Sequence, residues 1–465
     1  MLVDLLRGPL SSLTLYAVIH RISNLLLRLL VFLVVARAAR NVYVVRRRPR
    51  HLQHYGHLKS NLDDQYDPKY DKAESDSASD PIVIKALYIH PIKSCAPIEV
   101  KRALLTKIGF SYDRCFALAV DSDKDDNHWQ FISQRTKPRM SLIKQELWLP
   151  HDTSDPRDPL AQAGGCLIVS FPDPDPLVWT KRLQAIFESW SLTATPDVRF
   201  TVPLLPPASQ IDELGIQLRD FQIHSRTASG LDLGCLPDVA TALPKLKRFL
   251  KVPERQSLTL LRCTPDTLVP TNKNLAPLKY IGTPAMHGYT DQQPVHIINL
   301  PSVHATSPLL PKENQPLSAL RFRANMYIFG APAYDEETWK RFRILPKAAT
   351  TERRARVAPA LSVVCRTSRC TMPNVNPDTG LLEEENAPPE KKKGKPQPST
   401  TLVEYRTVEN GNPAALGYLG MHCVPEDSGF KEAIDQGADL YVEVGDEIEV
   451  LETGHHLYGS TGNDY

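Results

Sequence analysis

The eight cysteines of this chain include no CxxC pair and no close spacing of cysteine and histidine. A structural zinc site is therefore not expected, because such sites draw on closely spaced Cys and His ligands. A cleavable secretory signal is also lacking, so we expect the cysteines to be reduced and most of them to be small buried hydrophobic residues.

A strong net charge is lacking as well. The 55 basic and 53 acidic residues give a formal charge of +2, which argues against a nucleic-acid-binding protein. Glycine is scarce beside proline, with 22 and 40 residues, and this ratio predicts short strands joined by rigid turns rather than a helical bundle. The length of 465 residues and the hydrophobic content of 42% fit a folded body of about two or three domains.

The first fifty residues differ in composition from the rest. They contain nine arginines, no lysine and a single acidic residue, and their apolar stretch runs from Ile22 to Val45. A basic cluster at 46–50 follows, as expected on the cytosolic side of a membrane span. Residues 1–50 thus predict an N-terminal membrane anchor, with the mitochondrial outer membrane as the expected site and the folded body in the cytosol. An arginine-rich matrix presequence, a helix lying on a membrane surface and an untethered tail are the alternatives.

The remainder predicts a β-rich α+β fold with a barrel core. Residues 51–80 are polar and predict a flexible linker, and the folded body begins near Pro81. Helices are expected at 179–190 and at 240–250, the second beginning at Pro244, and a closing hairpin of the barrel at 439–451. Two segments, about 347–358 and 383–399, are expected to be inserted, solvated loops. The remaining apolar runs predict strands at 82–89, 115–120, 129–133, 141–149, 166–171, 197–202, 296–300, 323–330 and 361–366.

Several polar residues stand where predicted strands begin or end. Taken singly, each is an ordinary turn residue or a surface ion pair. Together they offer four cations, three neutral donors and one thiol, a set that suits an anionic, phosphate-bearing ligand with a soft metal centre. The cations are Lys93, Arg114, Arg323 and Arg369; the donors are Ser94, Asn325 and Ser368; the thiol is Cys370.

These motifs resemble a known family. ALYIHPIKSC (86–95), GFSYDR (109–114) and QRTKPR (134–139) are similar to the N-terminal β-barrel region of MOSC proteins. The second half resembles the MOSC domain itself, and the whole pattern resembles the amidoxime-reducing branch, which also carries an N-terminal anchor. The matching stretches there are YTDQQPVHIINLPSV (289–303), FRANMYIFGAPAYDEETW (322–339), SRCTMPNVNPDTG (368–380), LVEYR (402–406) and VGDEIEVL (444–451).

The resemblance implies a domain division and a cofactor. Residues 81–265 would form the MOSC N-terminal β-barrel region and residues 266–460 the MOSC domain. Cys370 would ligate molybdenum, and Cys365 would be structural. The pterin part of the molybdenum cofactor would be held by Lys93, Ser94, Arg114, Asp291, Arg323, Asn325, Ser368 and Arg369. The chain departs from the family pattern at Gln292 and Gln293, at Ala324 and at His422. The resemblance therefore does not predict which substrates the pocket accepts.

The resemblance also implies an activity. The chain would be a molybdenum-dependent oxidoreductase that reduces N-hydroxylated substrates, with electrons from NADH passing through a flavin reductase and a small b-type cytochrome. A molybdenum-cofactor sulfurase or sulfur carrier is one alternative, although no aminotransferase-like half is present to bind pyridoxal phosphate. A non-catalytic, membrane-tethered β-domain is the other.

Overall fold

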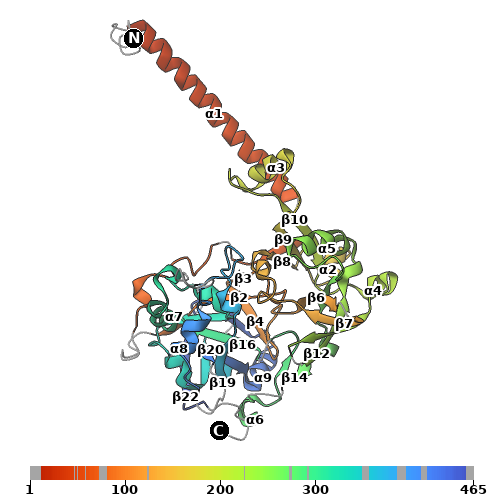
Figure 1. Cartoon of the computed structure of the whole chain (residues 1–465), viewed down its shortest axis with the longest axis vertical. Coiled ribbons are helices and arrows are strands. Elements are labelled where there is room, and N and C mark those ends of the chain that lie inside the picture. Colours follow the sequence, from red (N-terminus) through yellow and green to blue (C-terminus); the bar gives the residue numbers. More distant parts are fainter. Residues whose placement is uncertain are drawn as a thin grey trace. The chain divides into compact units, whose positions relative to one another are not determined.

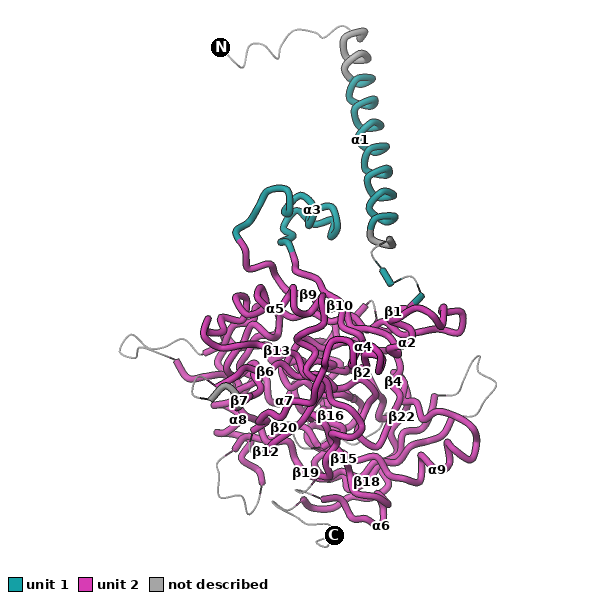
Figure 2. Tube along the Cα trace, turned by 90° about the vertical axis from the view of Figure 1, so that its right-hand side faces the viewer, with its two compact units in different colours: residues 1–51, 176–196 teal, residues 52–175, 197–465 magenta. Residues whose placement is uncertain are grey.

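A computed structural model gives the fold of the chain (Figure 1). The residues it describes form two compact units, which Figure 2 colours separately: unit 1 comprises residues 1–51 and 176–196, and unit 2 comprises residues 52–175 and 197–465. The described residues are 12–46, 48–49, 51–57, 59–72, 81–122, 125–224, 226–271, 275–290, 293–347, 356–384, 394–409 and 416–456.

The larger barrel of unit 2 joins strands from distant parts of the sequence. Its strand order is β17-β16-β20-β19-β18-β22-β2, and β17 pairs with β2 to close the ring, while β3 extends the sheet beyond β2. The early strand β2 therefore completes a barrel whose other strands all come from the second half of the chain. The strands are β2 (Ile82–Ile89), β3 (Ile98–Val100), β16 (Val295–Asn299), β17 (Met326–Phe329), β18 (Trp339–Leu345), β19 (Ala360–Arg369), β20 (Gly417–Pro425) and β22 (Glu447–Thr453).

The central strand β20 shows why this barrel forms a stable core. All of its residues are buried, because α7 (Leu300–Thr306) and α8 (Ser399–Tyr405) pack on it and its neighbours β16 and β19 flank it. A strand covered on both faces needs a nearly continuous apolar sequence, and GYLGMHCVP supplies one.

A second, smaller barrel lies beside the first in Figure 1. Its strand order is β11-β12-β13-β6-β7, and it is closed. A continuous apolar core extends from Leu118 and Leu260 of this barrel to Ile297 and Met421 of the larger one, so the two barrels share their packing. The strands are β6 (Phe116–Ser122), β7 (Asp125–Phe131), β11 (Leu218–Ile223), β12 (Arg226–Asp232) and β13 (Leu258–Arg262). The prediction of a β-rich fold with a barrel core is confirmed.

Two open sheets and one short ladder complete the β-structure that is described in unit 2. One has the order β1-β8-β9-β10, and the other has the order β21-β4-β5. The strands are β1 (Leu52–Tyr55), β4 (Arg102–Thr106), β5 (Gly109–Phe110), β8 (Lys144–Pro150), β9 (Cys166–Pro172), β10 (Asp197–Pro203) and β21 (Tyr441–Glu443), and the short pair β14 (Val269–Pro270) and β15 (Met286–His287) forms a further ladder. The remaining α-helices of unit 2 are α2 (Pro159–Gln162), α4 (Ala208–Leu214), α5 (Pro237–Phe249), α6 (Leu278–Ile281) and α9 (Asp427–Asp435).

Part of the predicted flexible linker is folded instead. β1 pairs with β8, and the side chains of Leu62 and Tyr70 are buried. The ring of Tyr70 packs edge-on against Phe329 at the end of β17. The prediction is wrong for this stretch because a few well-buried apolar groups anchor a segment that is polar on average. Residues 58 and 73–80 of the predicted linker lie outside the described residues.

Two further predictions need correction. The segment 439–451 does not form a hairpin, since β21 pairs with β4 whereas β22 pairs with β18 and β2. The chain is redirected at Gly445, whose φ is +93°, and the carboxylate of Asp446 accepts the backbone N–H of Glu443 at 2.8 Å. The helix α5 begins at Pro237 rather than at Pro244, and Pro244 lies inside it. The reason is that its buried residues Val239, Ala242, Leu246 and Phe249 follow one helical face from the first turn onward. Of the predicted inserted loops, residues 348–355 and 385–393 lie outside the described residues.

Unit 1 contains the helix α1 (Ser12–Arg46) and the helix α3 (Trp179–Ser189), which are in contact. Within α1, the stretch Ile19–Tyr43 has a mean hydropathy of 1.9, and none of its apolar window is buried. By length and composition this stretch can cross a membrane.

Candidate functional site

A large cavity of about 740 Å³ opens in unit 2, and residues of both barrels line it. Lining residues stand directly after β2, before β6, before β17 and at the end of β19. Ile223 and His224 at the end of β11 and Arg226 and Thr227 at the start of β12 line it as well. Loops that gather at the mouth of a barrel are a common place for a binding site.

The cavity is strongly cationic. The described residues that line it include lysine and arginine side chains but no carboxylate, a composition that favours a bound anion. These cations are Lys93, Arg114, Arg135, Arg226, Arg321, Arg323 and Arg369.

Cys370 presents a free, exposed thiol on the wall of this cavity. It follows β19 directly, and its Sγ accepts the backbone N–H of Met372 at 3.5 Å. Cys365, five residues earlier on the same strand, is buried, and burial raises the pKa of its thiol to about 12. The described residues contain no group of three or more His, Cys, Asp or Glu side chains that could enclose a metal ion.

Arg369 lies beside Cys370 and is held by the barrel. Its Nε donates to the carbonyl of Leu419 at 2.8 Å, its Nη1 donates to the carbonyl of Phe322 at 3.2 Å, and its Nη2 lies 2.6 Å from Nε2 of His296. Burial lowers the pKa of Arg369 to about 9, while Cys370 acts in the opposite direction.

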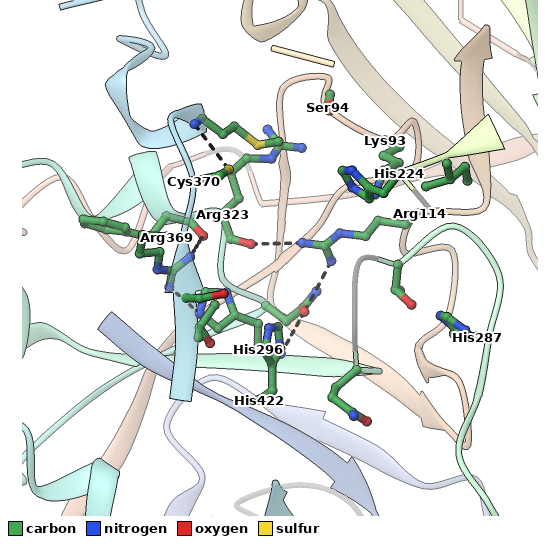
Figure 3. Close-up of a pocket in the computed structure, with 18 of the residues that line it drawn as sticks. Lys93, Ser94, Arg114, His224, His287, His296, Arg323, Arg369, Cys370 and His422 are labelled. Atoms are coloured by element: carbon green, nitrogen blue, oxygen red, sulfur yellow. Dashed lines mark hydrogen bonds between the residues drawn. The ribbon is translucent and has the colours of Figure 1, made fainter. Parts of the chain in front are cut away.

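His296 accepts the hydrogen bond from Arg369 as a neutral ring. Burial, followed by the charge of Arg369, holds the pKa of His296 well below its usual range. The ring of His422 on β20 lies 5.3 Å from that of His296 and also lines the cavity (Figure 3). Two imidazoles therefore lie on the wall of the cavity next to the guanidinium that flanks Cys370.

Arg114 is fixed by a buried network that extends across three chain segments. Its Nη2 donates to the carbonyl of Arg323 at 3.1 Å, and its Nη1 reaches Oδ1 of Asn325 at 3.4 Å (Figure 3). Its Nη1 also pairs with the carboxylate of Asp113. Burial alone would raise the pKa of Asp113, but Arg114 and His90 outweigh it and hold that pKa below its usual range.

Asn325 is buried and acts as an internal brace of the barrel. Its Oδ1 accepts the backbone N–H of His296 at 3.1 Å, and its Nδ2 donates to the carbonyl of Tyr88 at 3.2 Å. The side chain therefore links β2, β16 and β17 at the edge of the cavity. Because its amide already makes these hydrogen bonds, it has little capacity left to bond with a ligand.

Lys93 and Ser94 follow β2 and are both buried. The Nζ of Lys93 donates to the carbonyl of Tyr289 at 2.9 Å and lies 5.3 Å from the centre of the Phe131 ring. Within the described part of the chain, four hydroxyl oxygens are buried on the cavity wall without a hydrogen-bond partner, those of Ser94, Thr271, Thr290 and Thr367. Buried hydroxyls are normally satisfied, so these four indicate a polar ligand that would bond with them.

Three of the predicted binding residues adopt left-handed backbone conformations. The φ angles are 69° at Ser94, 50° at Arg114 and 53° at Arg323. Such values are uncommon for residues other than glycine, and they concentrate at sites where the surrounding structure holds a residue in place. Here they aim side chains from three loops at the same cavity.

The structure brings together eight of the nine residues that the sequence singles out. They share one cavity, although they lie as far apart in the chain as Lys93 and Cys370. Asp291, the ninth, lies outside the described residues, as does Gln292, whereas Gln293 is buried on the cavity wall. The eight are Lys93, Ser94, Arg114, Arg323, Asn325, Ser368, Arg369 and Cys370.

Sequence reasoning missed several lining residues. His296 lies within a predicted strand, where its apolar neighbours conceal its role. His224 and Arg226 flank the β11–β12 turn of the smaller barrel, which carries no distinctive motif. A histidine within an otherwise apolar strand was the one available signal for His296.

Two family models match the chain over the regions that build this cavity. One, described as the MOSC N-terminal beta barrel domain, matches residues 82–182, and one described as the MOSC domain matches residues 284–449. The chain belongs to the MOSC-domain proteins. The motifs at 86–95 and 109–114 fall within the first match, and the turn that carries Cys370 falls within the second.

The curated relatives that this chain is similar to include mitochondrial amidoxime-reducing components. Component 1 of Mus musculus is 22% identical over 340 residues, which cover 72% of this chain and 75% of the relative. Component 2 of Homo sapiens is 23% identical over 330 residues, which cover 70% of this chain and 73% of the relative. The similarity therefore extends over most of both chains at low identity.

Proposed function

We propose that this chain binds the molybdenum cofactor in the cationic cavity, with Cys370 as the protein ligand to the metal. Membership of the MOSC-domain proteins and similarity to amidoxime-reducing components support a function related to this cofactor. The observation that carries the proposal is an exposed thiol on the wall of a cavity lined by cations from five or more separate segments.

The residues present fit such a group. A phosphate needs guanidinium or ammonium donors, and the cavity offers Lys93, Arg114 and Arg323. A polar ring system needs neutral donors, and the cavity offers four buried hydroxyls that bond to no other described residue, those of Ser94, Thr271, Thr290 and Thr367. A soft metal needs a thiolate, which the guanidinium of Arg369 beside Cys370 would stabilise.

Each residue would have a separate task. Lys93, Ser94, Arg114 and Arg323 would bind and orient the pterin, and Arg114 is already fixed by Asp113 and Asn325. Ser368 and Arg369 would contact the pterin from the end of β19, directly before Cys370. Asp291, which lies outside the described residues, would contribute as well. When bound, the molybdenum cofactor supplies the two-electron redox chemistry.

The proposed reaction is the reduction of N-hydroxylated compounds. The N–O bond breaks, two electrons and two protons are consumed, and the parent nitrogen compound and water are released. The electrons would come from NADH through a flavin reductase and a b-type cytochrome. His296 and His422 stand on the wall where a substrate would approach Cys370, and the proposal assigns the substrate pocket to their side of the cavity.

The proposed setting is a membrane, with α1 as the anchor. The mitochondrial outer membrane with the body in the cytosol is the expected location, supported by the apolar stretch Ile19–Tyr43 and the mitochondrial relatives. Confinement to a membrane raises the effective concentration of membrane-bound redox partners.

The test is an NADH-driven assay with benzamidoxime as the substrate and the flavin reductase and b-type cytochrome added to the purified full chain. Reduction, with molybdenum bound at about one per chain, is the expected result. Cys370→Ala should lose both metal and activity, whereas Cys235→Ala, which removes an exposed thiol outside the cavity, should retain both.

Three outcomes would contradict the proposal or a part of it. Bound molybdenum without reduction of benzamidoxime would favour a sulfur-carrier or sulfurase-like role. A chain that binds no molybdenum would favour a non-catalytic β-domain. Full activity in the Cys370→Ala variant would refute the ligand assignment alone.

A further inference from the structure

The segment between β9 and β10, residues 173–196, carries a set of exposed large apolar side chains. β9 and β10 pair in register from Pro172 with Asp197, so the residues between them leave the sheet and return to it. Trp179 is 71% exposed and Leu192 is 80% exposed, and Leu183 is more than half exposed. Leu177, Val178 and Trp190 of the same segment are exposed as well.

These side chains gather on one face of α3. At 100° per residue, Trp179, Leu183, Ile186 and Trp190 lie on one side of the helix, and Lys181, Gln184 and Glu188 lie on the other. Clusters of exposed large apolar groups indicate a binding surface, since isolated ones are common but a continuous patch is not.

The other edge of α3 contacts α1, and both helices belong to unit 1, which is teal in Figure 2. The Nε of Arg40 donates to the carbonyl of Glu188 at 2.8 Å, and the hydroxyl of Tyr43 donates to the Glu188 carboxylate at 3.2 Å. The ring of Tyr43 packs edge-on against Phe187, with 6.0 Å between ring centres. These contacts leave the apolar face with Trp179 and Leu183 uncovered.

The place where α3 contacts α1 indicates what the apolar face of α3 binds. Arg40 and Tyr43 lie at the end of the apolar stretch Ile19–Tyr43, directly before the basic cluster. A helix held there lies at the level where a membrane-spanning α1 would leave the bilayer. Tryptophan and tyrosine prefer this interfacial level.

We propose that residues 176–196 form a second membrane contact, which inserts Trp179, Leu183 and Leu192 into the interface of the bilayer that α1 crosses. The inference rests on the proposed anchoring by α1. α3 then lies on the surface as an amphipathic helix, and its contact with α1 limits the orientations of the anchor relative to the bilayer.

The test uses the full chain in vesicles of phosphatidylcholine and phosphatidylserine whose acyl chains are brominated. Bromine quenches tryptophans that enter the bilayer. Trp129, Trp148 and Trp339 are buried in unit 2, so the quenched fluorescence should come from Trp179 and Trp190. The double variant Trp179→Phe/Trp190→Phe should lose the quenching, and the matched control Trp148→Phe should retain it.

Flotation of the same vesicles separates the two proposals. A chain that floats but shows no quenching would overturn the interfacial segment and leave the anchor standing. A chain that does not float would overturn the anchor and the segment together. Absence of lipid quenching combined with haem quenching on addition of the b-type cytochrome would assign the face to a protein partner, which also overturns the proposal.

Discussion

At the scale of single residues, Asn325 shows how the site and the barrel depend on the same atoms. Its amide accepts the backbone N–H of His296, donates to the carbonyl of Tyr88 and meets Arg114. A group that satisfies buried backbone atoms contributes to stability chiefly because its loss leaves them without partners.

Replacement of Asn325 by leucine keeps the volume and removes these bonds. We expect the free energy of unfolding to fall by about 2 to 4 kcal/mol, because buried donors and acceptors lose their partners. Urea unfolding of the purified chain measures this change. Molybdenum content should fall too, since Arg114 loses part of its support; a variant with unchanged stability and metal content would contradict the role of a brace.

Glu336 gives a second prediction at this scale. It is completely buried, and burial, followed by the charge of Glu337, raises its pKa from 4.5 to about 8. The hydroxyl of Ser302 donates to its Oε1 at 2.8 Å. The carboxyl therefore stays protonated in the folded chain at pH values where it is ionised in the unfolded chain.

The raised pKa of Glu336 makes the free energy of unfolding larger at low pH than at high pH. The folded chain binds more protons than the unfolded chain between about pH 4.5 and 8, so this contribution declines as pH rises through that window. Glu336→Gln should remove this part of the decline, which thermal unfolding from pH 5 to 8 would show. An unchanged pH profile in the variant would count against a protonated Glu336.

At the scale of elements, β20 depends on a glycine that allows close approach to β16. Gly420 has a φ of +81°, and a Cβ at this position would lie 2.6 Å from the carbonyl oxygen of Ile297 and 2.9 Å from Nε2 of His296. Only glycine tolerates both the left-handed conformation and the contact. The partner of Arg369 thus owes its position to a glycine on the neighbouring strand.

Gly420→Ala should destabilise the chain by about 2 to 5 kcal/mol through strain and overpacking. It should also reduce molybdenum content, because His296 and Arg369 must shift. Gly437→Ala is the matched control, since Gly437 also has a positive φ but nothing lies within 4 Å of its added Cβ. A similar loss of stability in the two variants would mean that the contact with β16 does not matter.

At the scale of the whole molecule, the two units have separate tasks in the proposed function. The cavity and every described residue that lines it belong to unit 2. The apolar helix α1 belongs to unit 1. We therefore expect the chemistry and the membrane attachment to be separable.

A chain without residues 1–50 should reduce benzamidoxime at a rate close to that of the full chain when soluble electron donors are supplied. Its flotation with vesicles should be largely lost, because a short interfacial segment alone binds a membrane weakly and reversibly. Loss of activity together with attachment would instead place the N-terminal helix among the elements that support the site.

Strand formation and much of the site were predictable from local sequence. The predicted strand at 82–89 coincides with β2, and the apolar run at 361–366 lies in β19. The run at 296–300 matches β16 except for Leu300, which begins α7. Strand pairing was not predictable in the same way. The terminal segment alternates as a hairpin would, yet β21 and β22 join different sheets, because pairing depends on partners such as β4 and β18 that are remote in the sequence.

The sequence by itself determined the chemical set: one thiol in a distinctive turn, arginines at strand ends and a family pattern that runs along most of the body. Only the tertiary structure decided that His296 partners Arg369, that Asn325 braces three strands and that the smaller barrel lends His224 and Arg226 to the cavity. The reason is physical. Periodicity and turn chemistry act over a few residues, whereas a binding site is made where long-range strand pairing, such as that of β2 with β17, brings distant side chains together.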